Sequence, residues 1–168
     1  MMSLKSPELM KGGSTVFLRV VIVLVGIGVL AAILRFPQTE GRAAHLSLIE
    51  VYLDPGVAYG YTASIPFFVA LYQAFRVLGY AARNEAFSER SLRAVRTIER
   101  CAMLLIGFSV VGVVYLSVAM RGQDDIAGGV ALGVVITLAS SVVAAVAAVF
   151  ERLLQNAADM KSENDLTV

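Results

Sequence analysis

Few side chains in this sequence could do chemistry, and the most conspicuous are a polar pair inside an apolar run. Gln73 and Arg76 stand three residues apart, well within the run from Val57 to Tyr80. Ionisable groups inside a membrane segment often mark an ion path or a ligand site. Arg76 is also within two helical turns of the end of the run, where a long basic side chain can reach the headgroups. We interpret the pair as an interfacial anchor, with an ion path or a ligand site as the alternative.

The other reactive side chains are isolated. The sequence has one cysteine, Cys101, and one histidine, His45, which excludes an internal disulfide and a zinc cluster. We interpret Cys101 as a packing residue and His45 as an exposed loop residue. The alternatives are palmitoylation or redox sensing for the thiol and pH sensing for the imidazole. Because no nucleophile–base pair, HExxH motif or phosphate loop is present, we expect no catalytic, metal-binding or cofactor-binding residues, and an enzyme is the least favoured class.

Composition places the chain in a membrane. Hydrophobic residues make up 58% of the sequence and charged residues only 16%. Soluble domains carry roughly 25% charged residues, which keep them in solution. We therefore predict an all-α integral membrane protein.

Four apolar runs are each long enough to cross the bilayer as a helix, which takes about 20 residues. They cover about residues 15–36, 57–80, 98–120 and 126–150. A cleaved signal peptide is the alternative for the first run, but that run exceeds the usual apolar length of about 7–15 residues. We predict a disordered tail over residues 1–14, a first helix that Pro37 ends, a basic loop over residues 83–97 and a C-terminal tail over residues 151–168.

The basic residues predict the orientation. With four spans, both termini lie on one side together with the loop after the second span. That side carries eleven of the 14 Lys and Arg residues, namely Lys5, Lys11, Arg19, Arg76, Arg83, Arg90, Arg93, Arg96, Arg100, Arg152 and Lys161. The opposite side carries Arg35, Arg42 and Arg121. Because cytoplasmic loops are enriched in Lys and Arg, we predict that both termini and the basic loop are cytoplasmic.

The basic loop also has features of a helix start. Ser88 is a suitable N-cap, and Phe87 before it could pack on Leu92 as a hydrophobic staple. An apolar stripe of Leu92, Val95 and Ile98 follows. The arginines 93, 96 and 100 are expected on the opposite side of this helix, which should continue into the third span.

We predict that this loop and the C-terminal tail pack together and dock a cytoplasmic protein. The surface would include Asn84, Phe87, Ser88, Arg90, Arg93, Arg96, Arg100, Asp165 and Leu166, with the apolar Phe87 and Leu166 making the contact between loop and tail. The alternative is that the arginines only set topology and touch anionic headgroups of the lipid bilayer, at ~1 kcal/mol per basic residue. Direct nucleic-acid binding is disfavoured, because the stretch is short and acids interrupt it.

Small residues recur at steps of four along the last span. Gly129, Gly133, Thr137 and Ser141 form a ridge that Ala145 continues. Such ridges let helix backbones approach closely. We predict a tight helix contact there, either within one chain or between copies in a homo-oligomer.

Two short stretches resemble a known family. Asn84, Phe87 and Ser88, followed by Leu92, Arg93, Arg96 and Ile98, resemble the central signature of the DUF2975 membrane proteins, and residues 163–168 resemble their C-terminal ending. The resemblance implies a four-helix bacterial inner-membrane protein of uncharacterised function without established catalytic residues. It also implies a partner, because relatives are often encoded beside a small Cro/C1-like helix-turn-helix regulator. The first hypothesis is thus a non-enzymatic signalling or interaction protein, and the alternative is a small-solute transporter or an immunity-type membrane protein.

Overall fold

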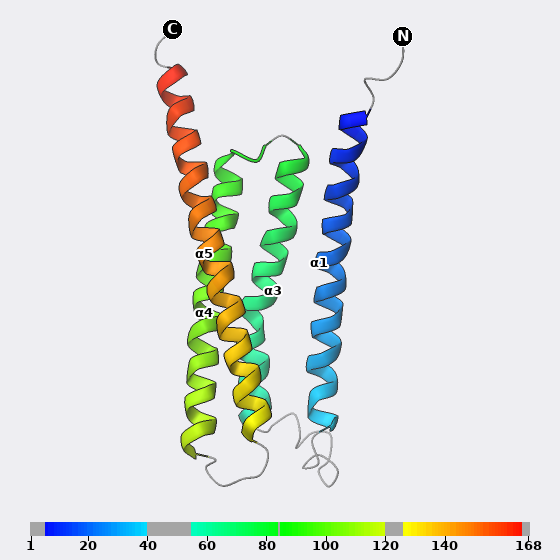
Figure 1. The fold of residues 1–168 in the computed structure, drawn as a ribbon, viewed down its shortest axis with the longest axis vertical. Helices are drawn as coiled ribbons and strands as arrows, with labels where there is room; N and C mark the ends of the chain where they lie inside the picture. Colours follow the sequence, from blue (N-terminus) through cyan, green and yellow to red (C-terminus); the bar gives the residue numbers. More distant parts are fainter. Residues whose placement is uncertain (1–5, 40–54, 84, 120–125, 166–168) are drawn as a thin grey trace.

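Four long helices make up the part of the chain that the computed structural model describes, which is residues 6–39, 55–83, 85–119 and 126–165 (Figure 1). They are α1 (Ser6–Thr39), α3 (Pro55–Ala82), α4 (Glu89–Ala119) and α5 (Ile126–Asp165). Each contains a stretch long and apolar enough to cross a membrane: Ser14–Arg35, Pro55–Ala82, Glu89–Val118 and Ile126–Ala157. The predicted all-α fold with four spans is confirmed.

The helix α1 is longer at both ends than the sequence suggested. It begins at Ser6, so the expected tail over residues 1–14 is mostly helical and Gly12 and Gly13 do not break it. Glycine costs a helix about 1 kcal/mol relative to alanine, which is a penalty and not a stop. The helix also passes Pro37 and ends at Thr39, since the φ angle of proline suits a helix even though its missing N–H weakens the turn.

The helices α4 and α5 extend past the length that a membrane requires. The 31 residues of α4 span about 46 Å and the 40 residues of α5 about 60 Å, against a hydrocarbon core of about 30 Å. The prediction that α4 starts before the third span and enters it without a break is confirmed. In α5, the segment from Glu151 to Asp165 continues the helix, so most of the expected tail is helical.

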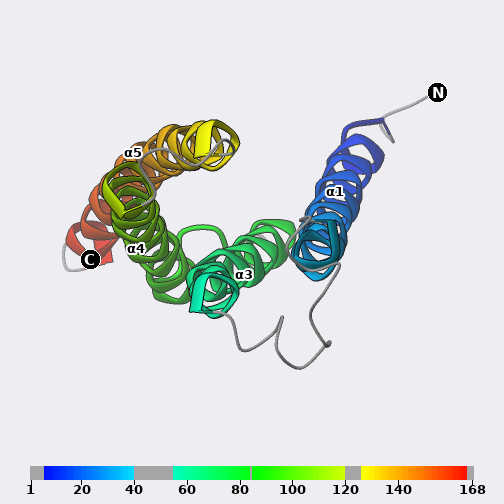
Figure 2. The ribbon, with the colours of Figure 1, turned by 90° about the horizontal axis from the view of Figure 1, so that it is seen from below.

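The helices stand side by side in chain order, in an open curved row with α1 and α5 at its two ends (Figure 2). The most extensive contact joins α4 to α5, followed by α3 with α4 and then α1 with α3. The helix α1 leaves most of its apolar side chains exposed, among them Phe17 at 69%. In a bilayer these side chains would face lipid.

The less exposed residues recur at alternating steps of three and four, which is the spacing of left-handed helix packing. In α5 the series is Ile126, Val130, Gly133, Thr137, Ser140, Ala144, Ala147, Glu151 and Leu154, with Ala148 and Ala157 partly buried beside it, and in α1 it is Thr15, Arg19, Ile22, Gly26, Val29 and Ile33. This pattern corrects the predicted ridge, because Ser141 and Ala145 are exposed. A constant step of four residues turns about 40° around the helix each time, so the ridge leaves the α4 side after Thr137.

Small residues hold the closest approaches between neighbouring helices. A Cβ atom added at Gly133 would collide with the side chain of Val113 on α4. The Ser109 hydroxyl donates a hydrogen bond to the Gly133 carbonyl oxygen at 2.7 Å. On the other side of α4, the Tyr59 hydroxyl donates to the carbonyl oxygen of Phe108. The central helix α4 is therefore tied to both neighbours by hydrogen bonds as well as by packing.

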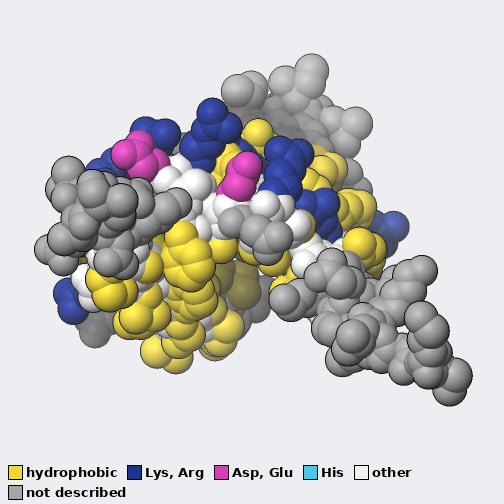
Figure 3. Space-filling view, turned by 90° about the horizontal axis from the view of Figure 1, so that it is seen from above, with side chains coloured by type: hydrophobic (Ala, Val, Ile, Leu, Met, Phe, Trp, Pro, Cys, Tyr) yellow, Lys and Arg dark blue, Asp and Glu magenta, His cyan; other side chains and the backbone are white. Residues whose placement is uncertain are grey.

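One end of the molecule gathers the basic side chains. The first turn of α1, the turn between α3 and α4 and the last turn of α5 all lie at this end (Figure 1). Seen from above, it displays Arg side chains with acidic side chains among them (Figure 3). We call it the basic end.

Candidate functional site

The turn between α3 and α4 is held by its own backbone. The amide of Glu85 donates to the carbonyl oxygen of Tyr80 at 2.9 Å, and the amide of Ser88 donates to that of Glu85 at 3.1 Å. The Ser88 hydroxyl then accepts a hydrogen bond from the Ser91 amide at 3.3 Å, as expected of an N-cap. Because the cap fixes where α4 begins, it also fixes the direction in which the following arginines project.

An apolar cluster joins the start of α4 to the far part of α5. Val95, Ala147 and Leu154 are buried together, with 5%, 6% and 9% of their surfaces exposed. The partly buried Val77, Leu92 and Ile98 pack against this cluster. The stripe expected at residues 92, 95 and 98 is therefore the surface of α4 that meets α5 and α3.

One ion pair lies beside the cluster. The guanidinium of Arg96 lies 2.7 Å from a carboxylate oxygen of Glu151, and Nε donates to the same oxygen at 2.8 Å. The Glu151 side chain is only 17% exposed and that of Arg96 is 41% exposed. This corrects the expectation that Arg96 projects away from the apolar stripe with arginines 93 and 100.

We call residues 83–100 together with residues 147–157 the helical platform. Within it, Arg83, Arg90, Arg93 and Arg100 are exposed. Arg93 pairs with Glu89 one helical turn earlier, at 3.7 Å, with side chains 68% and 86% exposed. An exposed pair of this kind contributes little stability, so these guanidinium groups remain available to a partner.

Phe87 does not lie where we expected it. It is 67% exposed, whereas Leu92 packs inward against the cluster. The turn is already fixed by the Ser88 cap and by backbone hydrogen bonds, so it does not need the expected staple. Among the described residues, Val95 and Leu154 make the apolar contact between the loop and the segment after the last span.

Three predicted docking residues lie at or beyond the limits of the described part of the chain. Asn84 and Leu166 lie outside the described residues, and Asp165 is the last residue of α5, with a side chain outside the described part. The expected contact between Phe87 and Leu166 stays a prediction. His45 also lies outside the described residues.

The predicted packing residues divide into two groups. Gly129, Gly133 and Thr137 lie on the α4 side, where the Cβ of a residue at 129 would come within 3.0 Å of Leu116. Ser141 is exposed and donates to the Thr137 carbonyl oxygen of its own helix at 2.8 Å. The close contact is therefore within the chain, between α4 and α5.

Arg76 lies in an aromatic setting that sequence reasoning missed. Its guanidinium lies 5.9 Å from the ring centre of Tyr72 and 5.7 Å from that of Tyr80. It donates to the Tyr80 hydroxyl at 2.6 Å and contacts the Gln73 amide oxygen at 3.5 Å. The available signal was the spacing of Tyr72, Arg76 and Tyr80, since residues four apart share one helix face.

The remaining candidates for chemistry are isolated among the described residues. Cys101 is a buried free thiol on α4 with 6% of its surface exposed. No group of three or more His, Cys, Asp or Glu residues in the described ranges could hold a metal ion. One hollow of about 200 Å³ opens between α4 and α5 and is lined by Val110, Val113, Val114, Val134, Thr137 and Leu138. Such a lining suits lipid chains better than a polar solute.

A known protein family matches most of this four-helix chain. The family model described as "Protein of unknown function (DUF2975)" matches residues 38–168. The chain belongs to the DUF2975 family. The match covers α3, α4 and α5 and leaves out all but the last residues of α1, the helix with the least packing.

A curated relative extends the likeness to almost the whole chain. The chain is 44% identical, over 159 residues, to "Uncharacterized membrane protein YoaS" of Bacillus subtilis (strain 168). The alignment covers 92% of this chain and 98% of the relative. No solved structure matches this DUF2975 chain. The comparisons establish a multi-pass membrane protein and its family.

Proposed function

We propose that this DUF2975 chain is a non-enzymatic protein of the bacterial inner membrane whose helical platform docks a cytoplasmic signalling partner. The observation that carries the proposal is the pair Arg96–Glu151 beside the Val95–Leu154 cluster. Together the ion pair and the apolar cluster hold α4 and α5 against each other, and both helices extend past the length of a bilayer. A loop that served only to set topology would not need this internal order.

The exposed side chains of the platform indicate the kind of partner that it would bind. Four exposed arginines favour an acidic surface, and the exposed Phe87 favours a small apolar pocket within it. Arginine is well suited to such contacts, because its planar guanidinium binds carboxylates through two parallel hydrogen bonds. A small helix-turn-helix regulator of the kind often encoded beside relatives is our candidate. Its basic DNA-binding face would be repelled, so the contact would use another face.

Site-specific photo-crosslinking in intact cells tests this function. A photoreactive amino acid replaces Phe87, and a matched probe replaces Phe17, which is similarly exposed on α1 but lies within its span. We expect a defined cytoplasmic protein to be captured from position 87 and not from position 17. Mass spectrometry then identifies the captured protein, and the sequence of that protein gives its charge.

Charge reversal gives the second arm of the test. Arg90→Glu with Arg93→Glu should abolish the crosslink, whereas Arg35→Glu at the other end of α1 should leave it unchanged. A crosslink only to lipid from position 87, or a protein crosslink that survives the double reversal, would contradict docking through the platform.

A further inference from the structure

Two arginines lie against the same segment of α3 from different helices. Arg19 of α1 lies over the Phe75 ring, at 5.3 Å from the ring centre, and its Nη2 atom is 3.3 Å from where a Cβ on Gly79 would be. Phe75 and Gly79 are the sequence neighbours of Arg76 and Tyr80. Since successive residues lie about 100° apart around a helix, the two guanidinium groups are at the same level on adjacent faces of α3.

Neither arginine has an anionic partner in the described part of the chain. The ion pairs found there involve Arg93 and Arg96. Arg76 uses the neutral oxygens of Tyr80 and Gln73, and the Nε atom of Arg19 is buried without a hydrogen-bond partner. The sequence provides no acidic side chain nearby, because residues 14–39 and 55–82 contain no Asp or Glu. Two positive charges in adjacent spans are thus left without a counter-charge from the protein segments that carry them.

The depth of the two residues corresponds to the headgroup region. Arg76 is six residues from Ala82 at the end of α3, and Arg19 is five residues from the start of the apolar stretch at Ser14. At 1.5 Å per residue these separations are about 9 Å and about 8 Å. Long basic side chains at such depths extend their charge toward the phosphates, and tyrosines prefer the same level.

We infer that Arg19 and Arg76, framed by Tyr72, Phe75 and Tyr80, bind the phosphate of an anionic phospholipid in the leaflet at the basic end. Guanidinium groups bind phosphate oxygens through paired, charge-assisted hydrogen bonds. The aromatic rings hold each guanidinium by cation–π contact and leave its remaining N–H groups for the ligand. A zwitterionic headgroup brings its own ammonium group, so only an anionic lipid brings a net negative charge to the two arginines.

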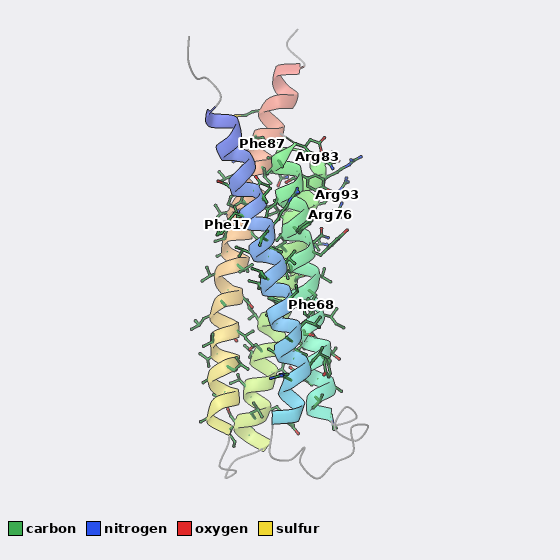
Figure 4. All side chains as sticks on the ribbon, turned by 90° about the vertical axis from the view of Figure 1, so that its right-hand side faces the viewer. Phe17, Phe68, Arg76, Arg83, Phe87 and Arg93 are labelled. Atoms are coloured by element: carbon green, nitrogen blue, oxygen red, sulfur yellow. The ribbon has the colours of Figure 1, made fainter. Side chains whose placement is uncertain are left out.

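The surface above Arg76 supports an anionic headgroup. Arg76, Arg93 and Arg83 project from the same side of the α3–α4 pair, in that order toward the basic end (Figure 4). Tyr72 is 62% exposed and would flank the upper part of an acyl chain. Arg83 and Arg93 also belong to the helical platform, but the lipid site itself, at Arg19 and Arg76, is separate from the α4–α5 contact on which the docking proposal rests.

Native mass spectrometry of the full chain in a neutral detergent tests the site. Phosphatidylglycerol and phosphatidylcholine are titrated in parallel, and the apparent Kd for the first retained lipid is measured. We expect phosphatidylglycerol to bind at least tenfold more tightly. Arg76→Gln and Arg19→Gln should each weaken that binding about tenfold, a change of about 1.4 kcal/mol, whereas Arg35→Gln should not.

Milder variants keep the test decisive if a glutamine variant fails to fold. Tyr80→Phe keeps the ring and removes the hydroxyl that Arg76 contacts, and Arg76→Lys keeps the charge and removes the planar fork. Both should weaken phosphatidylglycerol binding several-fold. Glycerol phosphate and inorganic phosphate, which lack acyl chains, should not compete at millimolar concentration.

Three results would overturn the inference. They are equal retention of the two lipids, unchanged binding in the Arg19 and Arg76 variants, and displacement of the lipid by inorganic phosphate, which would indicate a site for the free anion. The measurement uses purified protein without a partner. A failure of lipid binding therefore leaves the docking proposal standing, and the reverse also holds.

Discussion

The Ser109 hydroxyl of α4 donates a hydrogen bond to the Gly133 carbonyl oxygen of α5 at 2.7 Å. The Thr137 hydroxyl donates to the same oxygen at 2.9 Å from within α5. Such contact between a side chain and a neighbouring backbone requires that the two helices come close, and Gly133 allows it by having no side chain. In a membrane, small residues and interhelical hydrogen bonds of this kind drive association, because lipid tails are as apolar as the side chains.

Replacing Gly133 with alanine should separate α4 from α5. The added methyl group collides with Val113, and overpacking of this kind costs about 1–3 kcal/mol. Gly128→Ala is the matched control, because a Cβ there meets nothing within 4 Å and alanine favours a helix. We expect a clear fall in Tm in detergent for Gly133→Ala and an unchanged or higher Tm for Gly128→Ala. Equal values for the two variants would place the α4–α5 contact elsewhere.

The Arg96–Glu151 pair should be energetically coupled. A double-mutant cycle with Arg96→Gln and Glu151→Gln, read from Tm and from protease cleavage of the end of α5, should give a coupling of about 0.5 kcal/mol or more. The exposed Glu89–Arg93 pair is the control and should give less, because water screens it. Strictly additive effects at Arg96 and Glu151 would show that the pair does not join the two helices.

Loss of the α4 cap should loosen the turn before it. Ser88→Ala removes the oxygen that accepts from the Ser91 amide, at a cost of about 1 kcal/mol. Ser88→Asp keeps an acceptor and should restore the stability. Thr97→Ala, which removes only a hydroxyl bonded to its own helix at Arg93, is the control. Hydrogen exchange of the amides of residues 89–92 should rise in Ser88→Ala alone, and uniform exchange in all three variants would argue against the cap.

The orientation of the chain can be tested by labelling. In a background in which Cys101 is replaced by alanine, single cysteines at Gly41 and Gln123 should react with an impermeant maleimide added outside the cell. Cysteines at Ser88 and Ser162 should react only after the membrane is opened. The eleven basic residues that the sequence assigns to one side of the membrane are the physical reason. External labelling at Ser88 would reverse the topology and remove the basis for a cytoplasmic partner.

Particular residues show where the sequence was sufficient. Ser88 was recognisable as a cap because its role depends on the three residues that follow it. The arginines of the basic end could be grouped because four spans leave no other arrangement of the loops. Arg96 was misplaced, because its partner Glu151 is 55 residues away and helical spacing alone does not reveal which α4 face meets α5.

The sequence by itself determined the class, the four spans and the cap of α4, since length, hydropathy and local hydrogen bonding decide these. Its short motifs also determined the family resemblance. Only the tertiary structure decided the open row of helices, the alternating contact faces and the pairing of Arg96 with Glu151. It alone brought Arg19 of α1 to the level of Arg76 on α3. The physical reason is that an apolar helix in a membrane is attracted to lipid and to its neighbours almost equally. Which faces meet is therefore settled by shape, at positions such as Gly26 and Gly133, and not by hydrophobicity.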